Sequence, residues 1–401
     1  FLKALEQLTI KDSIDEDAKR ENANIDANTA MGTMLKYGSE GAKHFVDRYI
    51  LPEDMAQAHA DGDIHIHDKD FYMLTETCCQ INLTKLFENG FSTGHGYLKK
   101  PKSILSYAAL ACIAIQANQN EMHGGQAIPD FDYAMAPGVD ATYQKELKEA
   151  IAQQLAVQGK EADEAIRKAA RFVEIANPAY DTVPQGGLLP QKELRIAVDF
   201  AKRRTERATY QAMEAFIHNL NTMNSRAGAQ VPFSSINYGT DTSAAGRLVI
   251  RQLLEATRAG LGGGETAIFP VQIFKVKDGV NANEGEANYD LFRLAMQTSA
   301  ERLFPNFSFL DAPFNAQYYK EGNPDTEVAY MGCRTRVMGN THDPSRETTS
   351  GRGNLSFTSV NLPRIGIESR GNWPLFYHTL ENRMDLIVRQ LLHRLRIQSA
   401  K

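Results

Sequence analysis

The chain is poor in cysteine and contains no long apolar segment. It has 401 residues and four cysteines, and no two cysteines form a C-x-x-C pair, which argues against a structural zinc site within this stretch. No run approaches the roughly 18 apolar residues that a membrane-spanning helix needs, and no signal peptide opens the chain. The net charge of -5 lacks the basic excess of proteins that bind nucleic acids or membrane surfaces. These absences predict a protein of the reducing cytoplasm that binds neither nucleic acid nor membrane.

The sequence also lacks an initiating methionine. It begins at Phe1, and its last residues form a helical pattern that simply stops at Lys401. We therefore expect a piece of a longer protein, truncated at both ends. Its length suits either two domains or one large α/β unit.

Strands and helices alternate in the second half of the chain. The pattern predicts strands at 230–239, 267–276 and 306–312, with helices between them at 243–259 and 287–303. Such alternation indicates βαβ units and a largely parallel sheet, in which chemistry lies at the carboxyl ends of the strands.

The other segments give simpler patterns. Residues 1–60 read as polar helices and 143–175 as exposed helices, whereas 103–117 form a helix that is apolar on nearly every face. A helix of that kind belongs in a core or in a subunit interface, and it favours a dimer. Residues 354–366 read as a strand, and a final helix follows from about residue 374.

A lone cysteine, Cys333, ends a predicted strand in VAYMGCRTRVMGN (328–340) and precedes a long polar loop. Arg334 and Arg336 supply positive charge, which favours the reactive thiolate form, and Gly332 permits an unusual backbone. The alternative is a buried cysteine that packs as a small hydrophobic residue. The neighbours favour a reactive cysteine on a loop.

Two adjacent cysteines, Cys78 and Cys79, lie in TETCCQINL (75–83). In a strand they point to opposite faces, so only one of them can face a given site. They are either a pair of core residues or the source of a redox partner for Cys333.

Two histidines alternate with isoleucines in DGDIHIHDKDFY (61–72), so His65 and His67 share one face of a strand. With nearby aspartates, this pattern suits a metal hydrolase, although no second metal-binding cluster is evident. It equally suits two polar groups that hold a substrate, or histidines that only satisfy local hydrogen bonds.

Three further polar residues have a structural and a functional interpretation. Asn354 either caps a turn or forms a hydrogen bond to a substrate in the same site as Cys333. Gln116 lies on the apolar helix and forms either a hydrogen bond within the core or a specific contact with a nucleotide base. Lys145 is either a solvated helix charge or a phosphate ligand. The glycine-rich turn at 260–266 permits close approach of the backbone to a ligand such as a phosphate, although glycines alone are a weak signal.

Several blocks, in order along nearly the whole chain, resemble the catalytic subunit of the anaerobic (class III) ribonucleotide reductases, a glycyl-radical enzyme family. These blocks are DGDIHIHD, TCCQINL, KPKSI with HGG, APGVDATYQK, TAIFPVQIFKVKDGVN, YMGCR and GNLSFTSVNLPRI. A set of blocks in one order is far more specific than any single motif.

The resemblance implies a ten-stranded α/β barrel built from two parallel half-barrels, with a finger loop inside that carries the reactive cysteine. Residues 1–60 would be an N-terminal helical segment and 61–401 a partial barrel, with the finger loop near 328–353. Cys333 matches the loop tip, where it would become a thiyl radical and remove the 3′-hydrogen of a ribonucleoside triphosphate. Cys78 matches the second cysteine, which would give hydrogen to the departing 2′-hydroxyl group.

The resemblance also assigns ligands. Asn354 matches the residue of the formate-using branch, so formate would be the reductant, and His65 and His67 match paired histidines near ribose or formate. Lys145, in a Y-x-K match, and Gln116 would bind the ATP or deoxynucleotide effectors that select which base is reduced.

Three parts of the family pattern are missing from this sequence: the radical glycine, the two C-x-x-C pairs that hold zinc, and the N-terminal ATP cone. We expect these residues alone to be inactive. The complete enzyme would be a homodimer whose glycyl radical is installed by a radical-SAM iron–sulfur activating enzyme. The alternatives are a nucleotide-binding regulatory remnant without catalysis and another glycyl-radical enzyme, such as one of the pyruvate formate-lyase group.

Overall fold

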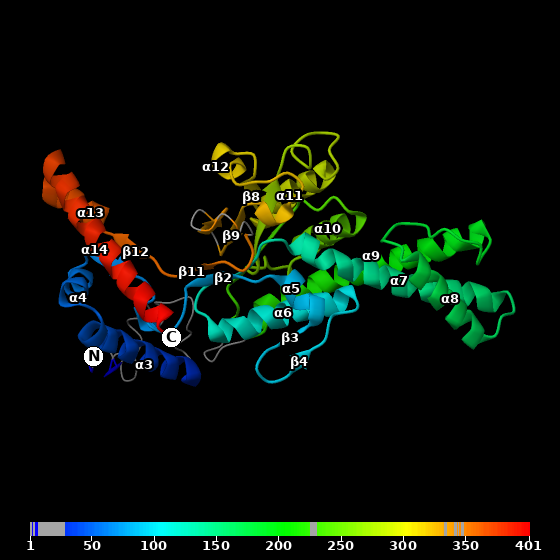
Figure 1. Ribbon diagram of the computed structural model, residues 1–401, viewed down its shortest axis with the longest axis horizontal. Coiled ribbons are helices and arrows are strands. Elements are labelled where there is room, and N and C mark those ends of the chain that lie inside the picture. The colour runs from blue at the N-terminus through cyan, green and yellow to red at the C-terminus, as the bar shows by residue number, and fades with distance from the viewer. Residues whose placement is uncertain are drawn as a thin grey trace.

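A six-stranded sheet runs through the middle of the molecule. The computed structural model describes residues 29–224, 231–332, 335–340 and 349–401, together with residues 2, 5, 6, 343 and 345. In spatial order the strands are β11 (Gly353–Asn354), β2 (Cys78–Gln80), β5 (Gln126–Ile128), β6 (Ser234–Tyr238), β7 (Val271–Val276) and β8 (Asn306–Phe309). Neighbours from β2 to β8 are parallel, and β11 is antiparallel to β2. The predicted largely parallel sheet is therefore confirmed (Figure 1).

The central strands β6 and β7 are buried on both faces, as expected of parallel strands covered on each side. Ile236, Tyr238 and Phe274 point to one face and join the main hydrophobic core. Ser235, Asn237 and Lys275 point to the other face, where they bind the segment that leads to Cys333. The two faces of these strands therefore have different chemistry.

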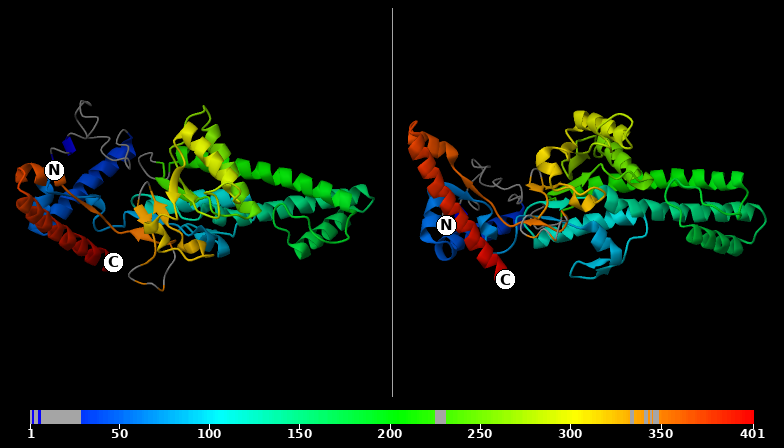
Figure 2. Two further views of the ribbon diagram at one scale, coloured as in Figure 1. Left: turned by 90° about the horizontal axis from the view of Figure 1, so that it is seen from above. Right: turned by 45° about the horizontal axis from the view of Figure 1, so that its top comes forward.

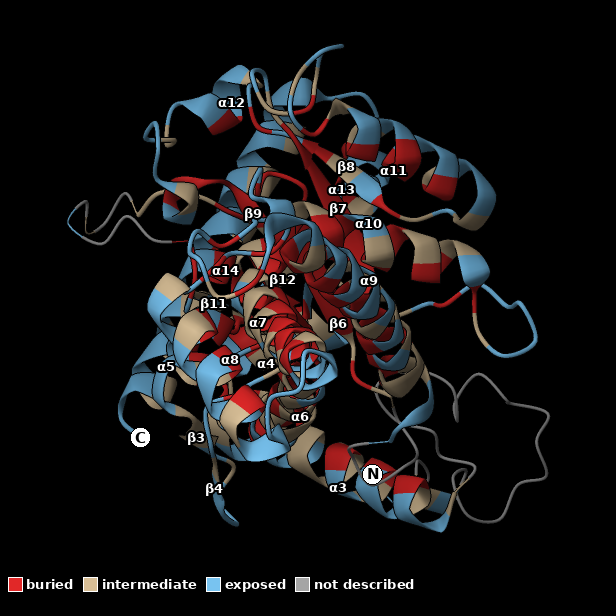
Figure 3. Ribbon diagram, turned by 90° about the vertical axis from the view of Figure 1, so that its right-hand side faces the viewer, coloured by how far each residue is buried: buried red, intermediate tan, exposed pale blue. Residues whose placement is uncertain are grey.

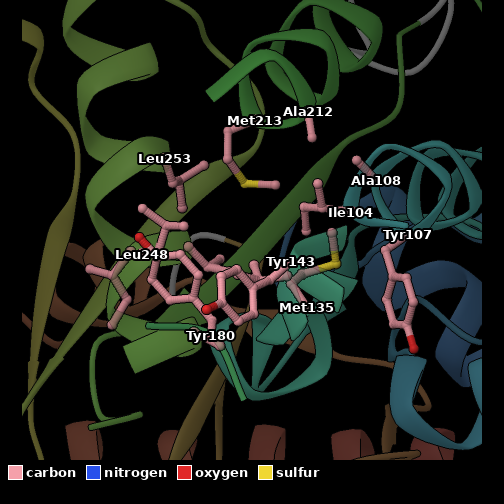
Figure 4. Close-up of a cluster of buried hydrophobic side chains, with 14 of the residues drawn as sticks. Ile104, Tyr107, Ala108, Met135, Tyr143, Tyr180, Ala212, Met213, Leu248 and Leu253 are labelled. Carbon is pink, nitrogen blue, oxygen red and sulfur yellow. The ribbon is translucent and has the colours of Figure 1, made fainter. Parts of the chain in front are cut away.

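Helices cover the first of these faces and extend beyond it. They are α6 (Ile104–Glu121), α7 (Phe131–Val157), α8 (Ala162–Ala176), α9 (Gln191–Thr222), α10 (Ala244–Ala259) and α11 (Tyr289–Arg302). The long helices α7 and α9 run together with α8 as an arm that projects away from the sheet (Figures 1 and 2). Seen along this arm, the buried residues gather between the helices and the sheet (Figure 3). Figure 4 shows part of this core, in which side chains of α6, α7, α9 and α10 interdigitate.

The prediction of exposed helices at 143–175 was wrong for the first of them. Tyr143, Leu147 and Ile151 of α7 are fully buried, because α7 packs against α6, α8, α9 and α10. Helix α8 does behave as an amphipathic surface helix: Ala165 is buried whereas Ile166 is exposed. Many alanines and charged residues made α7 look like a surface helix, but its large apolar residues recur at helical spacing.

Helix α6 confirms the predicted buried helix at 103–117. Its N-terminus is capped by Ser103, whose side chain accepts a hydrogen bond from the Ser106 N–H. The Ile104 N–H donates to Thr142 Oγ1 of α7 at 2.8 Å, which fixes the crossing of the two helices. Packing inside one chain accounts for the buried residues of this helix, and the predicted dimer is not tested by it.

A second layer joins the two ends of the chain. Its elements are α3 (Ala30–Phe45), α4 (Glu53–Ala60), β1 (Ile64–Ile66), β12 (Thr358–Val360), α13 (Leu362–Ser369) and α14 (Trp373–Ser399). Strands β1 and β12 pair in antiparallel fashion, and a separate hydrophobic cluster packs Ile64, Ile66 and Tyr72 against Leu386 and Ile387. Both chain ends lie on this side of the molecule (Figure 1).

The prediction of one strand at 354–366 was wrong. The segment forms β11, then β12, and becomes helix α13 at Leu362. Asn361 caps this helix by accepting a hydrogen bond from the Arg364 N–H at 3.1 Å, and Pro363 occupies its first turn. An Asn cap followed by an early proline is a helix start signal that the sequence already contained.

Short elements complete the fold. They are α5 (Leu83–Asn89), β3 (Phe91–Ser92), β4 (Tyr97–Leu98), α12 (Pro313–Ala316), β9 (Ala329–Met331) and β10 (Thr335–Val337). Within the described residues, no helix combines the length and the apolar character needed to cross a bilayer.

A buried carboxylate ties α7 to the loop after β6. Asp132 is fully buried, and its Oδ2 atom accepts hydrogen bonds from the backbone N–H groups of Gly239, at 2.8 Å, and Asp241, at 3.0 Å. Burial, with the nearby charge of Asp241, raises the pKa of the Asp132 carboxyl to about 7. Between about pH 4 and pH 7 the folded protein therefore holds a proton that the unfolded chain has released, so stability falls as the pH rises.

Replacing Asp132→Asn should flatten this pH dependence. The amide oxygen still accepts both backbone hydrogen bonds, but the side chain no longer titrates. From pH 5 to pH 8, urea denaturation should show the wild-type free energy of unfolding falling by about 2 kcal/mol more than that of the variant. Asp163→Asn, at an exposed position of α8, is the control. Parallel pH curves for wild type and Asp132→Asn would contradict the assignment.

Candidate active site

Cys78 and Asn354 lie directly opposite each other on paired strands. They are register partners in the antiparallel pair β2–β11, and the Thr77 N–H donates to the Asn354 carbonyl at 2.8 Å. Opposite residues of an antiparallel pair point to the same face of the sheet. The structure thus brings together two of the three residues assigned to catalysis by resemblance.

Cys79 points the other way. Its Sγ atom accepts a hydrogen bond from the Asn118 amide at 3.0 Å and donates to Gln126 Oε1 at 3.4 Å, against helix α6. Burial raises the pKa of the Cys79 thiol to about 12, so this cysteine stays a neutral thiol. The alternation expected of two adjacent strand residues is confirmed, and only Cys78 shares a face with Asn354.

Two glycines let the chain pass close to Cys78. Gly124 has φ +87°, and a Cβ there would lie 1.5 Å from the Thr77 carbonyl oxygen and 3.2 Å from Cys78 Sγ. The Gly125 N–H donates to Cys78 Sγ at 3.3 Å. Any side chain at 124 would collide with strand β2, so this HGG block keeps a backbone donor beside the thiol.

Strand β9, which leads to Cys333, lies close to Cys78. β9 and β10 form an antiparallel hairpin in which Met331 pairs with Thr335. Met331 and Val337 cluster with Ala127 and contact Cys78. An ideal Cβ on Gly125 would lie 3.4 Å from the Gly332 Cα atom. Residues 333 and 334 lie outside the described residues, so the structure does not place Cys333 itself. Its neighbour Gly332 lies beside Gly125, whose N–H donates to Cys78 Sγ.

His65 and His67 lie in the adjoining layer on β1 and directly after it. Their rings are 4.5 Å apart, and the ring of His67 is 4.1 Å from that of Phe357, three residues after Asn354. His67 Nε2 is 2.8 Å from Ser359 Oγ on β12. Burial and the neighbouring His65 lower the pKa of His67, which therefore is neutral near pH 7 and able to donate or accept a hydrogen bond.

Sequence reasoning missed a buried link between these two layers. His123 Nε2 lies 2.7 Å from Asp68 Oδ1, and its ring stacks on Phe71 at 4.2 Å. Burial opposes ionisation of Asp68, but the hydrogen bond and charge of His123 outweigh it and lower the pKa of the carboxyl. The link joins Asp68, which follows His67, to His123, which precedes Gly124. Both residues stood in quoted blocks, but nothing in the sequence showed that they meet.

A pocket of about 290 Å³ lies between the β9–β10 hairpin and β11. Asn354 lines it together with Arg336 and Arg352. Arg336 donates to the Asn315 amide oxygen and lies over the Phe314 ring, and Arg352 donates to the Met338 carbonyl. Among the described residues neither guanidinium group is paired with a carboxylate, so the pocket has positive charge available for an anionic group.

Lys145 and Gln116 are not brought together within one chain. Lys145 is exposed on α7, close to Glu146 and Glu149 at 4.0 and 3.8 Å. Gln116 lies twelve positions along α6 from Ile104, the residue that meets Thr142 of α7, and twelve helical residues span about 18 Å. The Gln116 Nε2 atom is buried and has no hydrogen-bond partner in the described part of the chain.

Two weaker expectations find no support in the geometry. Around His65 and His67, as elsewhere in the ranges that the structure describes, no group of three or more His, Cys, Asp or Glu side chains could hold a metal ion. The glycine turn at 260–266 uses its own backbone groups: Leu261 N–H donates to the Glu265 carbonyl and Gly263 N–H to its carboxylate.

Comparisons with known proteins agree with the sequence blocks. The family model for anaerobic ribonucleoside-triphosphate reductase matches residues 21–401. The Escherichia coli enzyme of this name is 29% identical over 385 residues, which cover 95% of this chain and 48% of that protein. The enzyme of phage T4 is 28% identical over 388 residues, or 95% of this chain and 56% of that protein. The chain thus spans about half the length of the curated relatives it matches.

Solved structures show the same fold. The anaerobic ribonucleotide reductase of Thermotoga maritima in complex with dATP and CTP aligns with a TM-score of 0.60 at 14% identity, over 99% of this chain and 60% of that one. A second structure of that enzyme, with dATP in its specificity site, gives 0.58 at 15% identity over 92% of this chain and 56% of that one. The predicted fold class, part of an α/β barrel, is confirmed, and the described residues supply six strands of its sheet.

Proposed function

The chain belongs to the anaerobic ribonucleoside-triphosphate reductase family, and we propose that it supplies the thiol-bearing site of an enzyme that reduces ribonucleoside triphosphates to 2′-deoxyribonucleotides. One observation carries the proposal: Cys78 and Asn354 face the same side of paired strands, and Gly332, which follows the finger strand β9 (Ala329–Met331), lies beside Gly125, the residue whose N–H donates to Cys78 Sγ. A thiol and an amide on one face, with the residue before Cys333 close by, suit a sugar that is attacked from one face and reduced from the other.

The family pattern assigns a role to each of the two thiols. By that pattern the Cys333 thiol would give its hydrogen atom to a glycyl radical, and the resulting thiyl group would remove the 3′-hydrogen of the ribose. The Cys78 thiol then supplies hydrogen as the 2′-hydroxyl group leaves as water. The Gly125 N–H, 3.3 Å from Cys78 Sγ, stabilises negative charge on this sulfur during the step.

Formate is the proposed reductant. One formate and one proton convert the 2′-C–OH group into C–H, with release of one water and one carbon dioxide, so electrons and atoms balance. Asn354, the register partner of Cys78, lines the pocket and offers an amide N–H group to the formate oxygens. His65 and His67 contribute hydrogen-bonding groups from the next layer.

Charge in the pocket supports a triphosphate substrate. Arg336 and Arg352 line it and have no carboxylate partner in the described ranges. Guanidinium groups bind phosphate oxygens in a fixed, bidentate geometry. We assign these two arginines to the phosphate end of the substrate and Asn354 to its sugar end.

Further components belong to the proposal through the family alone. They are a glycyl radical installed by a radical-SAM iron–sulfur activating enzyme, zinc in the region of that glycine, and a homodimer with nucleotide effectors. Electron paramagnetic resonance of the activated full-length protein checks the radical, and sedimentation velocity checks the dimer.

Cysteine variants of the full-length, activated enzyme test the function. Cys333→Ser and Cys78→Ser should each lower turnover by more than about 1,000-fold, because a serine O–H bond is too strong to exchange hydrogen atoms with carbon. Cys79→Ser, the matched control one residue along the strand, should stay within about tenfold of wild type, since it faces helix α6. Binding of nucleotide effectors should be unchanged in all three. Substantial turnover by Cys333→Ser would refute the radical mechanism and favour a regulatory role.

Asn354→Ala tests the formate site. Loss of the amide should raise the KM for formate by about tenfold and leave the KM for the nucleotide within a factor of about three. Release of labelled carbon dioxide from formate, measured against deoxynucleotide formed, is the assay. Asn361→Ala is the control, because that amide caps α13 and lies outside the pocket. An unchanged KM for formate would remove Asn354 from the site.

Lys145→Ala tests the effector site. The proposed ligands of the effector base and phosphates are Gln116, whose buried Nε2 atom has no hydrogen-bond partner among the described residues, and the exposed Lys145. Because one chain holds them far apart, they bind one effector together only across a subunit interface. Equilibrium dialysis with a labelled deoxynucleoside triphosphate should show about tenfold weaker binding to the variant. Lys168→Ala removes another exposed lysine, paired with Glu164 on α8, and should bind like wild type. Equal affinities in both variants would place the effector elsewhere.

A further inference from the structure

The strand that precedes Cys333 is held by polar side chains of the sheet at three places. Ser235 and Asn237 of β6 and Lys275 of β7 are all completely or almost completely buried. They point to one face, because Ser235 and Asn237 alternate along β6 and the register pairs Asn237 with Ile273, two residues before Lys275. Each of the three binds a different point between residues 327 and 332.

The Asn237 side chain binds both backbone polar groups of Tyr330 on β9. Its Nδ2 atom donates to the Tyr330 carbonyl at 2.9 Å, and its Oδ1 atom accepts from the Tyr330 N–H at 2.8 Å. On this edge of β9, where the described residues include no further strand, the side-chain amide makes the hydrogen bonds that a neighbouring strand would make. Because both polar groups of one residue are used, a shift of β9 by one residue along the sheet would break both bonds.

A buried ion pair holds the base of the same strand. Lys275 Nζ lies 2.9 Å from Glu327 Oε2, and the two side chains are 2% and 4% exposed. Thr240 Oγ1 donates to the same oxygen at 2.8 Å. Burial disfavours the ammonium charge, but Glu327 and Asp132 outweigh it and raise the pKa of Lys275. Displacing β9 would leave a buried charge without its partner, which is strongly unfavourable.

The third contact lies at the end of the strand. The Gly332 N–H donates to Ser235 Oγ at 3.0 Å, and both residues are buried. Gly332 has φ +57°, which ends the extended strand at this point. Cys333 is the next residue in the sequence, and one peptide unit spans only about 3.8 Å.

We propose that Ser235, Asn237 and the Lys275–Glu327 pair are positioning residues that set the finger strand, and with it the reactive thiol, at hydrogen-transfer distance from the ribose. The inference rests on the proposed function. A reacting atom displaced by about 1 Å loses rate by about 100-fold while ground-state binding of the substrate persists. All of these residues are buried and bind the segment from Glu327 to Gly332, so they act through the placement of β9.

Asn237→Ala in the full-length, activated enzyme tests the proposal. We expect kcat to fall by about 100-fold and the KM for the nucleotide to change by less than about threefold. The isotope effect on turnover of a 3′-deuterated substrate should rise, because hydrogen transfer to a misplaced thiyl group becomes the slow step. Ser235→Ala, a smaller change, should move both quantities in the same direction by about tenfold in kcat, and it provides the test if Asn237→Ala does not fold.

Gln272→Ala is the matched control. Gln272 lies on β7, is 2% exposed, and makes two side-chain hydrogen bonds, with Tyr238 at 2.7 Å and Thr257 at 2.8 Å, on the face covered by helices. It should lose stability without any change in the isotope effect. If Asn237→Ala and Ser235→Ala match this control while Cys333→Ser is inactive, the positioning role is overturned and the proposed function stands. If Cys333→Ser remains active, the function itself fails.

Discussion

The candidate site depends on the pairing of β11 with β2. These strands are only two and three residues long, and they join segments near residues 78 and 354 through the bond from the Thr77 N–H to the Asn354 carbonyl. So short a pair has little stability of its own. It persists because the parallel sheet continues on one side of β2, and because β12, α13 and α14 anchor the chain beyond β11. The position of Asn354 therefore depends on two hydrophobic cores at once.

Local patterns predicted most of the sheet. The alternation from 230 to 312 gave β6, α10, β7, α11 and β8 correctly, because each element is bounded by its own turn and has its own periodicity. The pattern failed at α7, where alanines and charged residues hid a buried helix, and at 354–366, where the Asn361 cap was overlooked. Both errors concern how an element packs or ends, which depends on neighbours or caps rather than on average composition.

The site was predictable only in part. Strand alternation separated Cys78 from Cys79 and put His65 beside His67, since both follow from a two-residue period. That Cys78, rather than Cys79, reacts stays a prediction from the family. The contacts of His123 with Asp68 and of Asn237 with Tyr330 join residues far apart in sequence. Nothing local distinguishes these polar residues from others, so only the folded chain shows their partners.

Three buried polar contacts hold the segment from Glu327 to Gly332 against one face of the sheet. The apolar helices α6, α7 and α9 supply the large core, whereas the face toward β9 carries Asn237 and the Lys275–Glu327 pair. A buried ion pair contributes little net stability, because desolvation of both charges offsets their attraction. Apolar residues of similar volume would hold the two surfaces together equally well, but they would tolerate sliding. Directional bonds fix one register, which is what the proposed positioning of Cys333 against the ribose requires.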